Sequence, residues 1–382
     1  VYKRQVLVGA NFPESRYYPN EPSIALNPKN PNEMLVATNG PVKNYYFSND
    51  AGYTWHRAGN YSFDLGRWGD PSVISDTSGN FYFFHLEREA TPSGLAMPDR
   101  VFCRKIPCDN LSGGWVDSSF AGLNSPKMQD KEWAAYDPVN QNLYLVWSEF
   151  DVYGSSNPNH FSNILFSRST NGGSSWSQPM RINENSGDCL DGNNSVMGAM
   201  PATGPNGEVY VSWPGPDGII FDRSTDQGAS WLTGDVIVAN NPAGDHYAVP
   251  GIYRGGSIPV IACDLSNGPY RGTIYINWSD QINGLNDTDV WLSRSTNGGM
   301  NWESPIRVND DSPGKHQMFH WLTVDSTNGY IYCMFYDRRN YPDNQTDVYL
   351  AVSRDGGASF SNYQISDSPF IPNQSTFMGD YS

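Results

Sequence analysis

The octapeptide STNGGSSW at Ser169–Trp176 recurs in close copies along the chain. The other clear copies are SNDAGYTW at Ser48–Trp55, STDQGASW at Ser224–Trp231, STNGGMNW at Ser295–Trp302 and SRDGGASF at Ser353–Phe360. A divergent copy, CDNLSGGW at Cys108–Trp115, lies in the wide gap between the first two. A turn that returns every 55 to 70 residues or so indicates one supersecondary unit repeated six times.

Each repeat holds four short segments with the residue pattern of β-strands. In the third repeat these are EWAAYD from Glu132, NLYLVWSE from Asn142, NILFSRS from Asn163 and MRINE from Met180, with the octapeptide between the last two. No amphipathic helix of ten or more residues is evident. Six units of four strands, bounded by Gly, Asn, Asp and Pro, predict an all-β fold, a β-propeller of four-stranded antiparallel blades.

The octapeptide itself has the chemistry of a turn. An Asp or Asn at its third position can accept hydrogen bonds from backbone N–H groups two residues on, and the Gly at its fifth position permits a positive φ. The aromatic residue at the eighth position is expected to pack between neighbouring sheets. Since Asn171 and Asn297 replace the Asp of other copies, and an amide is a poor substitute for a catalytic carboxylate, we interpret these turns as scaffold.

This octapeptide resembles the Asp box, or bacterial neuraminidase repeat, of the sialidase superfamily, and the resemblance covers all six units. The segments DKEW at Asp130–Trp133, FYDRRN at Phe335–Asn340 and MGDY at Met378–Tyr381 are similar to those of bacterial secreted sialidase-like proteins. The resemblance implies a sialidase-like β-propeller that acts on or binds glycans. Asp boxes also occur in propellers without sialidase activity, so the resemblance implies the fold more specifically than the reaction.

Composition and the lack of linkers favour a single domain, and the resemblance implies that it is secreted. No linker or charge run interrupts the 382 residues, so we expect a single propeller domain over residues 1–382. The net charge of −16 argues against nucleic acid or an anionic membrane as partner, and no apolar run is long enough to span a bilayer. We expect a monomeric, secreted or cell-surface protein whose signal peptide is absent from this sequence.

The five cysteines are too few for a disulfide framework. Cys103 and Cys108 either form a disulfide across a loop or are adjacent buried thiols. The sequence has neither a CxxC pair nor an HExxH motif, so no zinc site is predicted. The loop GDCLDGNNS at Gly187–Ser195 has enough oxygen atoms for calcium but not the spacing of a known calcium loop, and we expect no cofactor.

The two ends of the chain leave the blade number open. GDYS at Gly379–Ser382 is similar to the opening of a first strand, and QVLVGAN at Gln5–Asn11 has the pattern of an outer fourth strand. Together they suggest an incomplete seventh blade closed by strands from both ends. The alternative is a six-bladed propeller whose terminal strands overlap.

Carboxylates recur where the first strands of the blades begin. In a propeller these strands line the central channel, on the face opposite the octapeptide turns. The entrance positions are Glu21, Asp70, Glu132, Met200, Val249, His320 and Asp380. Like charges gathered in a narrow mouth raise one another's pKa, which keeps one carboxyl protonated for use as a general acid in glycoside hydrolysis. The catalytic candidates are Asp70, Asp130, Glu132 and Asp380; the alternative is that these groups cap strand ends.

Other side chains near these entrances are candidates for substrate contacts. Arg338 and Arg339 lie in a long loop and either clamp a carboxylate or sulfate or brace the loop through Asp337 and Asp343. The remaining candidates are Glu21, His320, as a proton carrier or a structural histidine, and Trp321, as a sugar platform or a core ring. An ion pair between Asp130 and Lys131 is expected to orient Glu132.

The resemblance to sialidases also implies three arginines on the substrate carboxylate, the first in an RIP motif, and a nucleophilic Tyr. No RIP precedes Ser48, RKIP at Arg104–Pro107 has an extra residue, and Tyr381 is the one tyrosine beside an entrance carboxylate. Sialic acid is therefore not predicted as the substrate. The first hypothesis is an extracellular glycoside hydrolase acting on an acidic or polar glycan, and the second is a propeller that binds a glycan or protein without turnover. A polysaccharide lyase is a third possibility.

Overall fold

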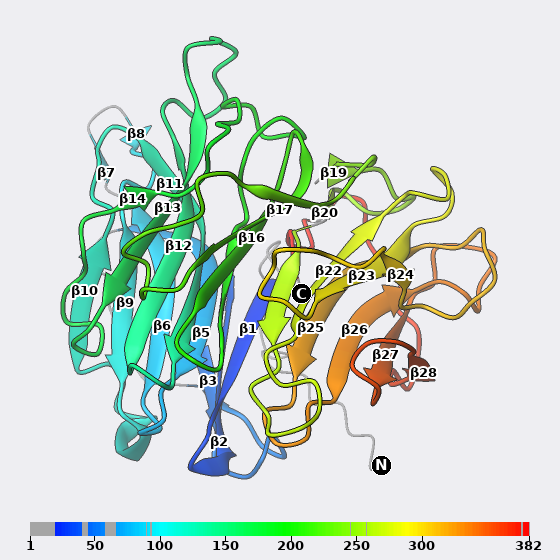
Figure 1. The fold of residues 1–382 in the computed structure, drawn as a ribbon, viewed down its shortest axis with the longest axis horizontal. Helices are drawn as coiled ribbons and strands as arrows, with labels where there is room; N and C mark the ends of the chain where they lie inside the picture. The colour runs from blue at the N-terminus through cyan, green and yellow to red at the C-terminus, as the bar shows by residue number, and fades with distance from the viewer. Residues whose placement is uncertain are drawn as a thin grey trace. The chain divides into compact units, whose positions relative to one another are not determined.

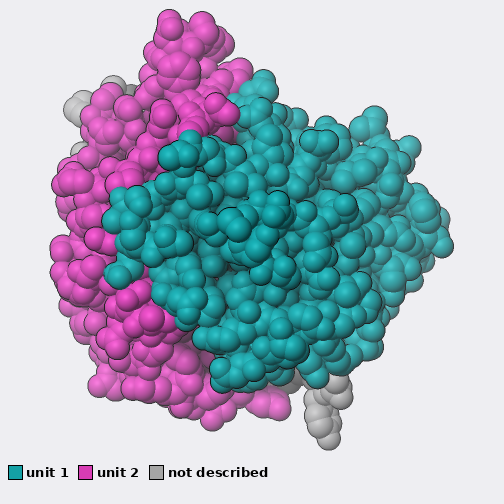
Figure 2. All heavy atoms as spheres, viewed as in Figure 1, with its two compact units in different colours: residues 1–5, 192–194, 200–382 teal, residues 6–191, 195–199 magenta. Residues whose placement is uncertain are grey.

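The structure is a computed structural model that describes residues 20–39, 45–57, 66–88, 90–91, 94–244, 246–256, 258–375 and 377–381. Strands make up nearly all of its regular structure, the exception being a single 3₁₀ turn, η1, at Cys108–Asn110 (Figure 1). Six four-stranded antiparallel sheets are the blades of a β-propeller, which confirms the predicted fold class. The chain divides into two compact units (Figure 2), each with three blades.

The unit of residues 6–191 and 195–199 holds the first three blades. The first blade contains β1 (Asn20–Asn27), β2 (Asn30–Asn39), β3 (Tyr45–Ser48) and β4 (His56–Arg57). The second contains β5 (Gly66–Ser75), β6 (Phe81–Arg88), β9 (Val101–Ile106) and β10 (Asp117–Ala121), with the small hairpin β7 (Ala90–Thr91) and β8 (Gly94–Leu95). The third contains β11 (Met128–Asp137), β12 (Asn142–Phe150), β13 (Ser162–Ser169) and β14 (Met180–Arg181).

The unit of residues 1–5, 192–194 and 200–382 holds the other three blades. The fourth blade contains β15 (Met200–Thr203), β16 (Val209–Gly215), β17 (Gly218–Ser224) and β18 (Val236–Ala239). The fifth contains β21 (Val260–Cys263), β22 (Ile274–Asp280), β23 (Asp289–Ser295) and β24 (Ile306–Arg307), preceded by the hairpin β19 (His246–Tyr247) and β20 (Gly255–Gly256). The sixth contains β25 (Gln317–Val324), β26 (Ile331–Asp337), β27 (Asp347–Ser353) and β28 (Ser361–Gln364).

The octapeptide turns close the hairpin between the third and fourth strands, as predicted. In the fourth blade the Oγ atom of Ser224 accepts a hydrogen bond from Gly228 N at 2.8 Å and donates one to Asp226 Oδ1 at 2.7 Å. Asp226 Oδ1 accepts a hydrogen bond from the backbone N–H of Ser230, which lies four residues further along the chain and not two as predicted. The reason is that the Ser224 hydroxyl accepts the N–H groups of Asp226 and Gly228. The aromatic residue reaches the preceding blade, as shown by Trp302, whose ring centroid lies 5.1 Å from that of Phe221.

The core lies along the second and third strands of the blades. Trp147, Trp213 and Trp278 occupy matching places in β12, β16 and β22 and are almost fully buried. The five cysteines are free thiols, which excludes the disulfide between Cys103 and Cys108; Cys103 is buried as the second alternative expects, whereas Cys108 is only partly buried. Burial raises the pKa of the Cys103 thiol, so that side chain acts as an inert core group.

The predicted seventh blade falls partly outside the described residues, since these do not include Gln5–Asn11. At the other end, residues 377–381 are described and form no strand. The expectation that GDYS opens a first strand is therefore wrong for its described part, Gly379–Tyr381. The prediction of one domain over residues 1–382 stays a prediction.

Candidate functional site

The first strands of the first three blades share one irregularity near their beginnings. The strand register shifts between Asn20 and Ser23, between Gly69 and Ser72, and between Asp130 and Trp133. Inside each shift one residue that is not glycine has a left-handed backbone conformation: Glu21 (φ 51°), Asp70 (φ 55°) and Lys131 (φ 52°). Such conformations cost of order 1 kcal/mol or more and often mark functional positions.

Hydrogen bonds connect these three strands side by side. Val73 N donates to Ser23 Oγ at 2.9 Å, which joins β5 to β1, and Ala134 N donates to Ser72 Oγ at 3.3 Å, which joins β11 to β5. Glu21, Asp70 and Lys131 therefore occupy equivalent places on adjacent strands. The alignment made from sequence, which matched Glu132 with Glu21 and Asp70, is wrong by one residue because the bulge shifts the register.

Two side chains link these equivalent positions. Asn39, the last residue of β2, donates from Nδ2 to Glu21 Oε2 and accepts Asp70 N at Oδ1 at 2.9 Å. Lys131 places Nζ 3.1 Å from Asp70 Oδ2 and 3.9 Å from Asp130 Oδ1. The expected ion pair between Asp130 and Lys131 is thus present, but the shorter contact is with Asp70. Asn39 could not be identified from the sequence, because its partners lie 18 and 31 residues away.

Glu132 is the most unusual carboxyl group in this cluster. It is 1% exposed, and neither of its carboxyl oxygens meets a hydrogen-bond donor from another described residue. Burial raises the pKa of Glu132 well above its usual range, and the neighbouring charges of Asp70 and Asp130 raise it further. A carboxyl group in this state keeps its proton at a pH where ordinary glutamates have lost theirs, as a general acid must.

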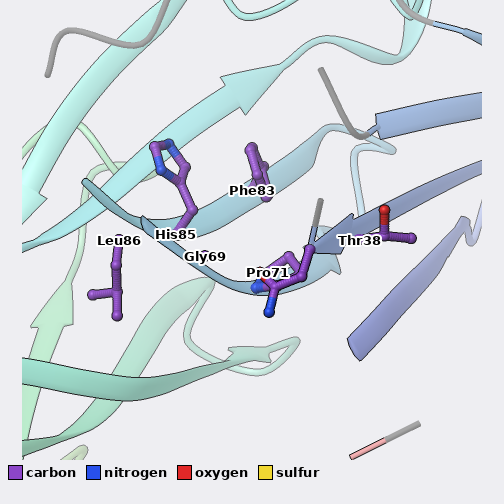
Figure 3. Close-up of a pocket in the computed structure, with 7 residues that line it drawn as sticks. Thr38, Gly69, Pro71, Phe83, His85 and Leu86 are labelled. Carbon is purple, nitrogen blue, oxygen red and sulfur yellow. The ribbon is translucent and has the colours of Figure 1, made fainter. Parts of the chain in front are cut away.

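A small pocket adjoins the same strands. It is lined by Thr38, Asn39, Gly69, Pro71, Phe83, His85 and Leu86 (Figure 3). Phe83 and His85 extend from one side of β6 and their rings stack with centroids 4.6 Å apart, whereas Leu86 points to the other side. Because Asn39 lines the pocket and also binds Glu21 and the backbone of Asp70, the pocket and the carboxylates belong to one site.

A buried charge network lies behind the pocket. Arg104 Nη2 donates to Glu87 Oε1 at 2.7 Å, and Arg104 Nε lies 3.4 Å from His85 Nε2. Glu87 and Arg104 are both almost fully buried. An ion pair in such surroundings fixes geometry more than it stabilises the fold, so this network is suited to holding His85 in place.

Asp380 and its neighbours belong to the unit that contains residues 200–382. The Arg254 guanidinium binds both carboxylate oxygens of Asp380, with Nε 2.6 Å from Oδ1 and Nη2 on Oδ2. Tyr381 is buried, and its ring centroid lies 6.4 Å from that of Trp321. Asp380 is therefore committed to a bidentate ion pair, which favours a structural role over the predicted catalytic one.

His320 has structural partners at both ring nitrogens. Nδ1 lies 2.9 Å from Ser279 Oγ and Nε2 lies 3.1 Å from the Ile258 carbonyl oxygen. The side chain is 4% exposed, and burial lowers the pKa of His320 to about 4. Hydrogen bonds at both ring nitrogens and the lowered pKa favour the structural alternative for His320.

The two arginines of the long loop after β26 brace that loop. Arg338 is 3% exposed and donates to Thr346 Oγ1 at 3.1 Å and to the Pro250 carbonyl oxygen at 2.6 Å. Arg339 donates from Nε to Asp337 Oδ2 at 2.7 Å and lies over the ring of Tyr349, with Cζ 4.2 Å from its centroid. These contacts correspond to the bracing alternative, with Asp337 as the main acidic partner.

The predicted site residues thus separate into two groups. Glu21, Asp70, Asp130 and Glu132 lie together in the unit of residues 6–191, whereas Asp380, His320, Trp321, Arg338 and Arg339 lie in the unit of residues 200–382. Within the described ranges, no three His, Cys, Asp or Glu side chains are grouped so that they could hold a metal ion. No described helix has the length and apolar character needed to cross a membrane.

Comparison with known proteins identifies the fold. No protein-family model and no curated protein matches the sequence. Among solved structures, a protein of unknown function from Dyadobacter fermentans is similar with a TM-score of 0.56 and 11% identity, over 85% of this chain and 92% of that chain. An ulvan lyase from a new polysaccharide lyase family is similar with a TM-score of 0.54 and 13% identity, over 91% of this chain and 85% of that chain. The NanB sialidase from Streptococcus pneumoniae is similar with a TM-score of 0.51 and 9% identity, over 86% of this chain and 68% of that chain. These likenesses show a sialidase-like propeller fold.

Proposed function

We propose that this protein is an extracellular glycoside hydrolase that acts on a polar glycan, with Glu132 as its proton donor. The observation that carries the proposal is the isolated, buried Glu132 carboxyl group beside two further carboxylates. Glycoside hydrolysis needs one carboxyl group that is protonated and one that is ionised. The similar folds of a sialidase and an ulvan lyase support a glycan as the substrate class.

The roles in this mechanism follow from the surroundings of each group. Glu132, whose pKa is raised by burial, donates its proton to the glycosidic oxygen as the bond to the sugar breaks. Asp70 or Asp130, both held by Lys131, supplies the carboxylate that attacks the sugar carbon or activates water. Asn39 lines the neighbouring pocket, where it would orient sugar hydroxyl groups, and Glu21 accepts a hydrogen bond from the Asn39 amide and so fixes its orientation.

The experiment that tests this proposal is product release from a panel of glycans by wild-type protein and by Glu132→Gln. The substitution keeps the side-chain shape but removes the proton that is donated, so kcat/KM on the cleaved glycan should fall by about 10²- to 10⁴-fold. The matched control is Glu303→Gln, at an exposed glutamate paired with Arg294, which should retain wild-type activity. Unchanged activity in Glu132→Gln would show that Glu132 is not the proton donor.

A second candidate function is a propeller that binds a glycan or a protein without turnover. This function is favoured because four predicted site residues in the unit of residues 200–382 are engaged in structural contacts: Asp380, His320, Arg338 and Arg339. The catalytic proposal then depends on the carboxyl groups of the other unit alone. Saturable binding on a glycan array with no released sugar would establish this function. A lyase would instead release an unsaturated product that absorbs in the near ultraviolet.

We also propose that the octapeptide turns are Asp boxes and that the protein is a monomer, secreted or presented at a bacterial cell surface. The hydrogen bonds of the turns and the net charge of −16 support this assignment. Fractionation of the source cells, with sedimentation analysis of the purified protein, would test location and oligomeric state separately.

A further inference from the structure

Lys131 stands at a position where the two preceding blades carry carboxylates. Its left-handed backbone conformation (φ 52°) matches that of Glu21 and of Asp70, and the register shift in β11 matches those in β1 and β5. A long side chain at φ > 0 is uncommon. The bulge therefore places an ammonium group where the other two strands place acids.

The contacts of Lys131 bridge two blades. Nζ lies 3.1 Å from Asp70 Oδ2 on β5 and 3.9 Å from Asp130 Oδ1 on β11, and the lysine is 7% exposed. An ion pair with so little exposure to water is screened weakly by salt. Lys131 therefore holds the Asp70 carboxylate by a hydrogen-bonded ion pair and lies within ion-pair distance of Asp130.

The charge of Lys131 also acts on Glu132. The groups that influence Glu132 are Asp70 from β5 together with Asp130 and Lys131 from β11; the aspartates raise the pKa of Glu132, whereas Lys131 lowers it. Tyr153, in the segment after β12, is a further titratable group close enough to be influenced by Asp130 and Lys131. A general acid works best when its affinity for the proton is not so high that the proton is never released.

We propose that Lys131 is a positioning residue for the proton donor Glu132: its ammonium group, carried on the bulge next to Glu132, ties Asp70 of the second blade to the third blade and so sets the arrangement of charges around Glu132. This inference rests on the proposed hydrolase function and adds a residue to it. Lys131 itself is not required to contact the substrate.

The test uses two substitutions with opposite expected effects. Lys131→Met removes the positive charge, so the basic limb of the pH profile of kcat, which reports the proton on Glu132, should move up by about one pH unit. Asp70→Asn removes a negative charge beside Glu132; because Asp70 is itself a catalytic candidate, this variant is followed by infrared titration of Glu132 and not by kcat, and the titration midpoint should move down. Lys131→Arg keeps the charge and should restore the wild-type limb, with a smaller loss of kcat than Lys131→Met shows.

A measurement that needs no activity separates this inference from the proposed function. The carbonyl stretch of protonated Glu132, identified by its loss in Glu132→Gln, can be titrated by infrared spectroscopy in wild type, Lys131→Met and Lys131→Arg. The inference expects a higher titration midpoint in Lys131→Met and a wild-type midpoint in Lys131→Arg. Equal midpoints in all three proteins would overturn it. If the midpoints shift as expected but the protein cleaves no glycan, the hydrolase proposal is rejected, whereas the electrostatic effect of Lys131 on Glu132 is supported.

Discussion

Replacing the first serine of an octapeptide turn tests the scaffold interpretation quantitatively. In Ser224→Ala the buried N–H of Gly228 loses its acceptor and Asp226 loses a donor. An unsatisfied buried N–H costs about 1 kcal/mol or more, and a hydrogen bond to a charged group about 1.5 kcal/mol when that group is exposed, as Asp226 is. We expect a loss of about 2 to 3 kcal/mol. In Ser169→Ala the lost partner is the neutral Asn171, so the loss should be nearer 2 kcal/mol.

Urea unfolding followed by tryptophan fluorescence measures both losses, with Ser361→Ala at an exposed position of β28 as the control. The two variants should also differ in their response to pH. Hydrogen bonds from Ser230 and Ser224 lower the pKa of Asp226 to about 2. The ionised Asp226 carboxylate therefore contributes its full share of the folding stability above the ordinary Asp pKa, and this stabilisation is lost as the pH falls toward 2. The loss in Ser224→Ala should therefore approach that in Ser169→Ala in acid. A loss below about 0.5 kcal/mol in both variants would refute the scaffold interpretation.

Three further predictions concern stability. Since the pKa of Glu132 is raised in the folded protein, the unfolded chain gives up this proton at a lower pH than the folded protein does, and wild type loses stability as the pH rises above the ordinary Glu pKa; Glu132→Gln should therefore gain melting temperature over wild type above about pH 4 and not below it. Arg254→Met should cost about 2 to 3 kcal/mol by leaving Asp380 without its bidentate partner, and adding Asp380→Asn should recover part of that loss in thermal unfolding. Gly299→Ala should be more destabilising than Gly52→Ala in urea, because the new Cβ would lie 2.1 Å from a Phe221 ring carbon in the first case but 3.6 Å from its nearest neighbour in the second; equal losses would mean that packing does not set the cost.

The fold was predictable from the sequence because the information is local and repeated. Each octapeptide carries its own serine, acid or amide, glycine and aromatic residue, and the strands on either side show their alternation without reference to distant segments. Even the divergent copy at Cys108–Trp115 sends its aromatic ring toward the preceding blade, where Trp115 lies 5.9 Å from Tyr45 between ring centroids.

The site was predictable only in part, because its geometry depends on non-local contacts. The sequence identified Asp70, Asp130 and Glu132 as a group, and the structure brings them together around Lys131. The sequence could not show the β-bulge that brings Lys131 into register with Asp70, because the residue pattern around Asp130 is compatible with a strand with or without one extra residue. The sequence also could not show that Arg254, which lies 126 residues from Asp380, forms an ion pair with the Asp380 carboxylate.

The proposed mechanism requires that Glu132 keeps its proton at a pH where ordinary glutamates are ionised. Infrared titration of the wild-type protein, with Glu132→Gln as the reference, measures that proton without any substrate. The account predicts a carboxylic acid carbonyl band that persists at a pH where ordinary glutamates are ionised and that is missing from Glu132→Gln. A Glu132 band that disappears together with those of the exposed glutamates would contradict it.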